Sequence, residues 1–173
     1  SLINAVSEKF DMSKKWYELK AKLLGVEKLA YHERSVPYGD IEKEYTYEDA
    51  IKIISKVFKR LDPKFDELLK MFVEEGLIDV YPRKGKRGGA FCVYFLKSQP
   101  TYIMLNYTNK INDVETFAHE LGHAINNEFM KEKQNALYFE TPTSTAEVAS
   151  TFMEDFVFEE LMKDAADEEK LSI

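Results

Sequence analysis

The sequence contains a single cysteine, Cys92, among its 173 residues. One thiol cannot form a disulfide within the chain, which excludes a disulfide-stapled secreted fold and predicts a reducing, cytoplasmic location. Long apolar runs are missing as well. A membrane-spanning helix needs roughly 18 consecutive apolar residues, so we expect no membrane partner.

An excess of positive charge is also absent, because 24 basic residues stand against 31 acidic ones and give a net charge of -7. Proteins that bind nucleic acid present a positive face to the phosphate backbone, so we expect no nucleic-acid partner. Peptides and small molecules are not excluded. One local exception is Arg83–Arg87, with four basic residues in five, which we expect to be a mobile loop rather than a nucleic-acid patch.

The chain shows no internal repeat and no low-complexity linker, and its length predicts one region, residues 1–173. Apolar residues recur at helical spacing within residues 1–76. Residues 77–107 are instead rich in aromatic and β-branched residues, which favours a small β element. Helical spacing returns over residues 108–173. We therefore expect a mainly α fold with a small β element.

Local signals mark where these elements begin and end. Gly25 and Gly76 are typical of helix ends, whereas Thr46 and the pair Asp62-Pro63 are typical of helix starts. A polar, irregular segment is expected over residues 31–39, and the charged tail over residues 164–170 is expected to fray. The expected helices span about 2–24, 46–61, 62–75, 112–130 and 144–163, and the expected strands 90–96 and 101–107.

The most informative motif is H-E-L-G-H at residues 119–123. On a helix, residues four apart stand one above the other, so His119 and His123 can close on one metal ion. Glu120 is rotated by about 100° and can reach a water beside that ion. This is the pattern of zinc hydrolases. Gly122 costs the helix about 1 kcal/mol relative to alanine, which indicates close approach by another element.

The start of this helix and the packing of its surroundings are also predicted. Asn112 is expected to cap the helix, with Glu115 as its capping-box partner. Cys92 lies in an expected strand with no visible partner base, so we interpret it as a packing residue. The alternative for the two motif histidines is that surface residues fall at this spacing by chance.

A catalytic zinc usually takes three protein ligands and leaves one position for water. The longer metzincin motif is excluded, because Asn126 and Phe129 stand where glycine and histidine would be required. His32 lies far upstream in a polar segment and is expected to be a surface residue. Glu147, 24 residues after His123, is the better candidate. Its alternative role is in the capping box formed by Ser144-Thr145-Ala146-Glu147.

Glu154 lies seven residues beyond Glu147, close to the same face of the expected helix. An acid at this position can hydrogen-bond the free ring nitrogen of a ligating histidine. The alternative is an exposed acid on a helix rich in Glu and Asp.

The sequence resembles the oligoendopeptidase F branch of the thimet oligopeptidase-like zinc metallopeptidases. Three blocks of sequence carry the resemblance, over about residues 80–160. They are Asn112-Asp113-Val114 leading into Ala118–Ala124, Ala146–Phe152 followed by Glu154, and Gly88-Gly89-Ala90-Phe91-Cys92 with Pro100 and Tyr102–Asn106. The sequence departs from many relatives at Asn126, where they carry histidine, and at Met153, where they carry asparagine.

The resemblance implies the helical, zincin-type catalytic region of a larger two-part peptidase with a channel. It implies one Zn²⁺ per chain, with His119, His123 and Glu147 as ligands and Glu120 as the catalytic base. Short peptides are the implied substrates. The implied substrate-binding residues lie in a strand that holds the peptide by main-chain hydrogen bonds, and they are Gly88, Gly89, Ala90 and Phe91.

The function expected from the sequence is therefore that of a zinc-dependent metalloendopeptidase acting on short oligopeptides. Relatives run to several hundred residues, so the remainder of a full-length peptidase is an expected partner. Two other classes stay open. One is a zinc-containing peptide-binding fragment that is catalytically incomplete, and the other is a helical interaction protein with a fortuitous H-E-x-x-H.

Overall fold

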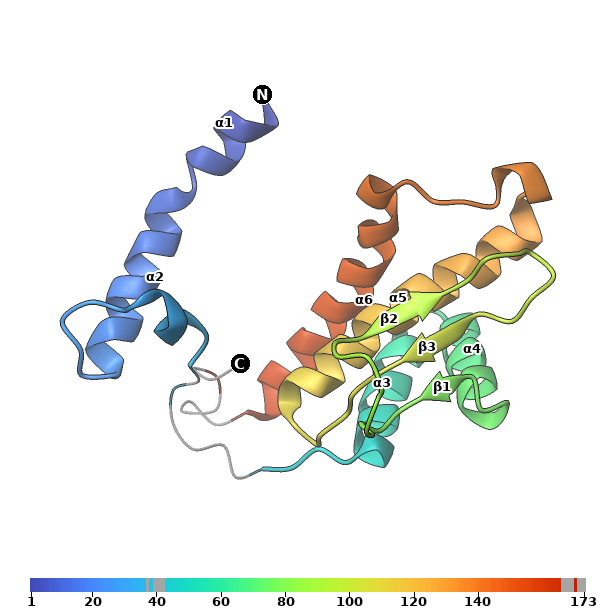
Figure 1. The fold of residues 1–173 in the computed structure, drawn as a ribbon, viewed down its shortest axis with the longest axis horizontal. Coiled ribbons are helices and arrows are strands. Elements are labelled where there is room, and N and C mark those ends of the chain that lie inside the picture. Colours follow the sequence, from blue (N-terminus) through green and yellow to red (C-terminus); the bar gives the residue numbers. More distant parts are fainter. Residues whose placement is uncertain (37, 39–42, 166–169, 171–173) are drawn as a thin grey trace. The chain divides into compact units, whose positions relative to one another are not determined.

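The computed structural model describes residues 1–36, 38, 43–165 and 170 of the chain (Figure 1). It divides into two compact units, Ser1–Glu42 with Ala165–Ile173 and Lys43–Asp164, which we call unit 1 and unit 2. Among the described residues, the structure contains no helix that combines the length and the apolar composition required to cross a membrane.

Unit 1 contains two helices, α1 (Leu2–Ser7) and α2 (Phe10–Leu23), and the 3₁₀ helix η1 (Tyr31–Ser35). The single helix expected over residues 2–24 is therefore wrong in detail, because the chain breaks between α1 and α2. The expected stop at Gly25 is confirmed by its positive φ of 71°, which glycine adopts without a Cβ penalty. Residues 37 and 39 of the expected irregular segment lie outside the described residues.

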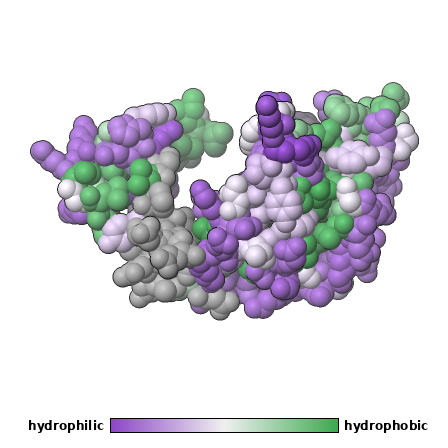
Figure 2. Space-filling view, turned by 60° about the horizontal axis from the view of Figure 1, so that its bottom comes forward, coloured by the Kyte–Doolittle hydropathy of each residue, from purple (hydrophilic) through white to green (hydrophobic). Residues whose placement is uncertain are grey.

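The helices of unit 1 leave many apolar side chains exposed, and part of the apolar surface in Figure 2 belongs to them. Its η1 segment is fastened to α2 by Lys20, whose Nζ donates to the carbonyl oxygen of Arg34 at 2.6 Å. The exposed apolar side chains are Leu2, Ile3, Val6, Phe10, Met12, Trp16, Tyr17 and Leu19.

Unit 2 opens with two helices, α3 (Tyr47–Leu61) and α4 (Pro63–Glu74). The predicted caps are confirmed. Thr46 accepts a hydrogen bond from the main-chain N–H of Asp49, and Asp62 accepts one from Lys64. Each cap satisfies a donor that the first turn of a helix leaves free.

A three-stranded sheet follows, with the order β1-β3-β2. Strands β2 (Phe91–Val93) and β3 (Tyr102–Met104) are antiparallel, which confirms the expected hairpin, although both are shorter than expected. Strand β1 (Ile78–Asp79) pairs in parallel with β3. It was not predicted, because two residues cannot show the alternation by which a strand is recognised. The order of the strands leaves β2 at an edge of the sheet.

The basic segment Arg83–Arg87 is a turn, as expected, and two of its side chains, Arg83 and Lys86, make polar contacts. The ammonium of Lys86 donates to the carbonyl oxygens of Asp79 at 3.0 Å and Tyr81 at 2.8 Å, and its side chain is only 2% exposed. Arg83 pairs with the Asp79 carboxylate at 2.6 Å. These two cations hold the pKa of Asp79 at about 2. The expected mobility of this segment stays a prediction.

The last two helices are α5 (Ile111–Lys133) and α6 (Thr143–Asp164), with the 3₁₀ helix η2 (Ala136–Tyr138) between them. Both long helices confirm the prediction. Of the tail over residues 164–170 that is expected to fray, residues 166–169 lie outside the described residues.

The start of α5 differs from the prediction. Helix α5 begins at Ile111, and the carboxylate of Asp113 accepts hydrogen bonds from the main-chain N–H groups of Thr108 at 2.7 Å and Lys110 at 2.9 Å. Asn112 and Glu115 therefore do not form the cap, because Asp113 already stands three residues after the true cap position. Glu115 lies half-buried on the side of the helix instead.

Helix α5 is the centre of unit 2 and contacts α3, α4, α6, β2 and β3 (Figure 1). Its apolar stripe is buried in the core of unit 2. The structure thus confirms a mainly helical fold with a small sheet. The buried stripe of α5 consists of Val114, Phe117, Ala118, Leu121 and Ile125.

Candidate metal centre

The two motif histidines project from the same side of α5. They are one helical turn apart, and their ring centroids lie 5.0 Å from each other with an interplanar angle of 81°. The opposite side of the helix is anchored by its buried apolar stripe, so the rotation of α5 and the direction of both rings are fixed by core packing. Both rings are only partly exposed.

Helix α6 brings Glu147 to these histidines. Its Oε2 lies 3.3 Å from Nε2 of His119 and 3.5 Å from Nε2 of His123. One ligand atom from each residue lies within 4.8 Å of the others. The alternative capping role is not what the structure shows, because α6 already begins at Thr143 and the Glu147 carboxylate accepts a hydrogen bond from Ser150 at 2.8 Å.

Close packing of α5 and α6 makes this approach possible. A Cβ built at Gly122 would lie 2.6 Å from the carbonyl oxygen of Ala149 and 2.6 Å from Cα of Ser150. Real Cβ atoms essentially never come so close to backbone, so any side chain at Gly122 would force the helices apart. The inference from the sequence that another element approaches this glycine is confirmed, and the element is α6.

A second acid from α6 orients one histidine. The Glu154 carboxylate lies 2.8 Å from Nδ1 of His119. A carboxylate at this distance favours the tautomer with its proton on Nδ1, which leaves the Nε2 lone pair free for a metal. On His123, burial is the main cause that lowers the pKa, and a hydrogen bond with the main chain of Ala146 opposes it. A neutral ring is the form that binds a metal.

These donors fit a zinc ion. Zinc binds histidine nitrogen and carboxylate oxygen at about 2.0–2.2 Å, so ligand atoms arranged tetrahedrally around it lie about 3.3–3.6 Å apart. The separations of 3.3 and 3.5 Å between the Glu147 oxygen and the two ring nitrogens match that spacing. Two imidazoles and one carboxylate are also a donor set that catalytic zinc sites use. His32 is exposed in unit 1 and is not a member of this group.

Glu120 lies next to the group and is only 7% exposed. Burial raises the pKa of its carboxyl, while His119 and a hydrogen bond from the main chain of Cys92 lower it. The bond to Cys92 connects the acid directly to the edge strand β2. This contact could not be predicted from sequence patterns, because it joins residues 28 positions apart on different elements.

A cavity of about 420 Å³ opens in front of the metal-binding group. Of the four predicted substrate-binding residues, Ala90 and Phe91 line it, whereas Gly88 and Gly89 do not. Thr141 and Thr143, which precede or begin α6, also line the cavity and were not predicted. The full lining consists of Ala90, Phe91, Cys92, Tyr94, His119, Glu120, His123, Thr141, Thr143, Ala146 and Glu147.

Cys92 itself is not an activated nucleophile. Burial raises the pKa of its thiol to about 12, and the negative charges of Glu120 and Glu128 act in the same direction. A thiol with so high a pKa is protonated at neutral pH and unreactive. This agrees with its interpretation as a packing residue.

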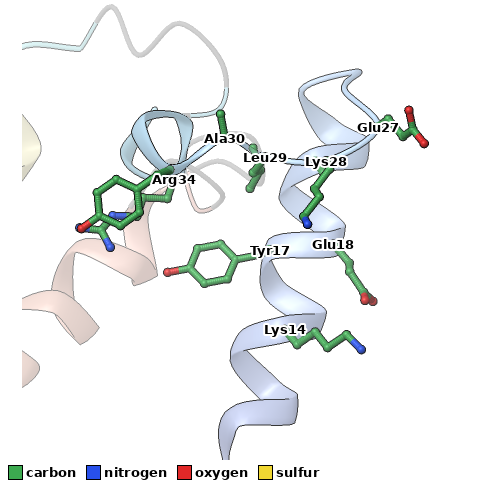
Figure 3. A pocket seen from close by; sticks show the side chains of 10 residues that line it. Lys14, Tyr17, Glu18, Glu27, Lys28, Leu29, Ala30 and Arg34 are labelled. Carbon is green, nitrogen blue, oxygen red and sulfur yellow. The ribbon is translucent and has the colours of Figure 1, made fainter.

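Unit 1 contains a separate cavity of about 720 Å³ between α2 and the segment that leads into η1 (Figure 3). Tyr17 reaches into it from α2, and Arg34 stacks its guanidinium 4.0 Å from the ring centroid of Tyr31. Its ten lining residues include no histidine or cysteine. This cavity therefore does not offer a comparable metal site.

A helix that presents two histidines and an intervening glutamate, completed by a glutamate from the next long helix, defines a zincin-type metallopeptidase site. The family comparison agrees with that class. The chain belongs to peptidase family M3, whose family model matches residues 12–173, and its relatives place it in the oligoendopeptidase F branch.

Among the relatives, an oligoendopeptidase F homolog of Lactococcus lactis is 28% identical over 169 residues, which cover 98% of this chain and 28% of the relative. A homolog of Borreliella burgdorferi is 32% identical and is matched over 99% of this chain and 29% of its own length. The chain thus spans less than a third of these relatives.

Solved structures of other peptidases share this fold. A peptidase from Chlamydophila abortus superposes with a TM-score of 0.80 at 28% identity, over 99% of this chain and 29% of that one. PZ peptidase A, solved with an inhibitor, superposes with a TM-score of 0.73 at 25% identity, over 90% of this chain and 29% of its own.

Proposed function

We propose that the full-length protein is a zinc-dependent metalloendopeptidase that hydrolyses peptide bonds within short oligopeptides. The observation that supports this most directly is the convergence of His119, His123 and Glu147 beside the carboxylate of Glu120, in one open cavity. Membership of peptidase family M3 supports a peptidase, and the relatives' names describe oligopeptide-cleaving enzymes.

In this proposal His119, His123 and Glu147 hold one zinc ion per chain. Zinc bound there would supply a Lewis acid that polarises the scissile carbonyl and lowers the pKa of water to about 7. Glu154 holds the His119 ring in the required tautomer through Nδ1. Ser150 donates to Glu147 and limits the orientations of that carboxylate.

Glu120 is the general base. Its carboxylate accepts the proton of the attacking water and then passes it to the leaving amine. Its position supports this role, because it belongs to the same cavity as the three ligands but is rotated by about 100° around α5 from His119. Its burial raises the pKa of the carboxyl, which makes it a stronger proton acceptor once ionised.

The peptide would lie along the edge strand β2. Ala90 and Phe91 line the cavity beside Glu120, and Gly88 and Gly89 precede them along the chain. A strand at a sheet edge can pair with an extended peptide through main-chain hydrogen bonds, which recognise a peptide without requiring particular side chains. The single cysteine, half-buried and unpaired, supports a cytoplasmic location for this activity.

The test is turnover of a quenched fluorescent peptide by the purified full-length protein, with product masses measured alongside. We expect cleavage at internal bonds, loss of cleavage after removal of the metal with a chelator, and recovery on addition of zinc. Turnover that survives complete metal removal would contradict the proposal.

The second candidate, a zinc-containing peptide-binding fragment that is catalytically incomplete, rests on the chain's coverage of less than a third of its relatives. Tight peptide binding by the zinc-loaded protein with no cleavage would favour this candidate.

A further inference from the structure

The edge strand β2 has one side bound to β3 and one side turned to the cavity. In an antiparallel pair, successive residues alternate between those bonded to the partner strand and those whose main-chain groups face outward. Ile103, which stands opposite Cys92 on β3, donates its main-chain N–H to the carbonyl oxygen of Leu77, away from β2, so Cys92 and Ile103 do not exchange hydrogen bonds. By this alternation Phe91 and Val93 bond β3, while Ala90 and Cys92 present their main-chain groups to the cavity.

The segment that leads into this edge lacks the support of a sheet. It contains three glycines, and two of them have positive φ, 84° at Gly85 and 81° at Gly89. Glycine backbone has more freedom than any other, so ordering it costs entropy. The orientation of the Ala90 main chain therefore depends on the contacts that hold Gly89, the residue just before it.

The side chain of Asn106 provides that support. Its Nδ2 donates to the carbonyl oxygen of Arg87 at 2.9 Å and to that of Gly89 at 2.8 Å. Both neighbours are acceptors, so the amide nitrogen, and not its oxygen, must face them. Asn106 follows β3 by two residues and therefore ties the glycine-rich segment to the strand that β2 pairs with. Lys86 anchors the start of the same segment through Asp79 and Tyr81.

A second cavity begins at this point. It measures about 380 Å³ and is lined by Gly89, Ala90, Leu105, Asn106, Tyr107, Asp113 and Thr116. Ala90 lines both this cavity and the one at the metal-binding group. The chain from Cys92 to Gly89 therefore runs without a break from the cavity at Glu120 to the side-chain amide of Asn106.

We propose that Asn106 is a positioning residue for the peptide substrate, which holds the Arg87–Gly89 backbone so that the Ala90–Cys92 edge is ready to pair. It does not touch the reacting atoms. Its effect falls on peptide binding, and it grows with the length of peptide that extends along the edge past Ala90. This inference rests on the proposed function and names the residue that prepares its substrate strand.

The test compares Asn106→Ala and Asn106→Asp in the full-length, zinc-loaded protein. Asn106→Asp removes both donors and places a negative charge against two carbonyl oxygens, so its effect should be the larger. For a peptide long enough to pass Gly89, we expect KM to rise about 5–20-fold, as the loss of two hydrogen bonds implies, with kcat within about twofold. For the shortest peptide that is cleaved, KM should change little.

Asn112→Ala is the matched control, because this exposed asparagine on the first turn of α5 makes no side-chain hydrogen bond among the described residues. It should leave KM unchanged. An unchanged KM for the long peptide in both Asn106 variants would overturn the inference. An equal rise in KM for long and short peptides, together with loss of zinc or a lower Tm, would also overturn it. That pattern is expected of a purely structural residue.

A binding measurement distinguishes failure of the role of Asn106 from failure of the proposed function. The Kd of the long peptide is measured by anisotropy in Glu120→Gln, with and without Asn106→Asp. A weaker Kd with Asn106→Asp supports the inference even if the wild-type protein cleaves no peptide, an outcome that would contradict the proposed function alone. Absence of any peptide binding would overturn both.

Discussion

The carboxylate of Glu154 lies 2.8 Å from Nδ1 of His119, while the other nitrogen of the same ring lies 3.3 Å from Glu147. Both acids come from α6, two turns apart, so in the proposed centre one helix would supply a ligand and also orient a ligand on its neighbour. The relative position of α5 and α6 therefore determines the geometry of the whole centre.

Removal of the orienting acid should weaken metal binding without abolishing it. We expect Glu154→Ala to lower zinc affinity about 10–100-fold, the usual effect of losing such a partner. Glu154→Gln should lose less, because its amide oxygen still accepts from Nδ1. Competition with a chromogenic chelator measures the affinity. Glu159→Ala, an exposed acid on the same helix, is the control, and an equal loss in that variant would contradict the role of Glu154.

Gly122→Ala should destabilise the protein although alanine is the better helix former. The added Cβ would meet backbone atoms of Ala149 and Ser150 at 2.6 Å, and overpacking of this kind costs about 1–3 kcal/mol. Because the helices must separate, zinc affinity should fall as well. Thermal unfolding and metal content are the measurements. Gly88→Ala, where a Cβ would meet nothing within 4 Å, should change neither, and a Gly122→Ala variant as stable as wild type would contradict this account.

The two histidines of the proposed metal centre could be predicted from the sequence because their arrangement is local. Helical periodicity alone places His119 above His123 and turns Glu120 away from them. Spacing could not decide whether Glu147 is a ligand or a capping residue, and the family resemblance favoured the ligand. Glu154 was predicted from its place on the same helical face, with an exposed acid as the alternative. The contact from Cys92 to Glu120, the bonds of Asn106 and strand β1 could not be predicted, because each depends on tertiary pairing between distant segments.

The environment of Glu115 also could not be predicted from the sequence. The sequence indicated a cap, but the structure places the residue half-buried, with its Oε1 buried and without a hydrogen-bond partner among the described residues. Burial, with a smaller contribution from Glu154, raises the pKa of Glu115 to about 7. A capping prediction considers only neighbours along the helix, whereas this environment is created by α6.

The raised pKa of Glu115 predicts a pH dependence of stability. Its carboxyl ionises near 4.5 when unfolded and near 7 when folded, so folding favours the protonated form. Its contribution is therefore complete below pH 4.5 and is lost as pH rises through about 7. Glu115→Gln should remove this loss and raise the Tm at pH 8 more than at pH 4. Equal shifts at both pH values would contradict the prediction.

The contribution of Glu160 to stability should depend on pH in the opposite direction. Its carboxylate pairs with Lys163 at 2.8 Å, Lys56 at 2.6 Å and Arg60 at 3.1 Å, and the first two cations are the main causes that lower its pKa from 4.5 to about 2. Its contribution to stability is present above pH 4.5 and is lost as pH falls through about 2.

Glu160→Gln should therefore cost about 1–3 kcal/mol at pH 7, as expected for hydrogen bonds to a charged group. The cost should shrink towards pH 2. Denaturant unfolding at several pH values measures it, and Glu159→Gln is the exposed control. A cost that is independent of pH would exclude these ion pairs as its cause.

In the proposed mechanism Glu120 accepts the proton and the three ligands hold the zinc. One paired measurement tests this separation of roles: zinc content beside peptide turnover for Glu120→Gln and His123→Ala in the full-length protein. Glu120→Gln keeps the size of the side chain but cannot accept the proton. It should retain its zinc and lose turnover by about 10²–10⁴ or more. His123→Ala should lose zinc and turnover together. Near-normal turnover in Glu120→Gln, or loss of its zinc, would contradict the account.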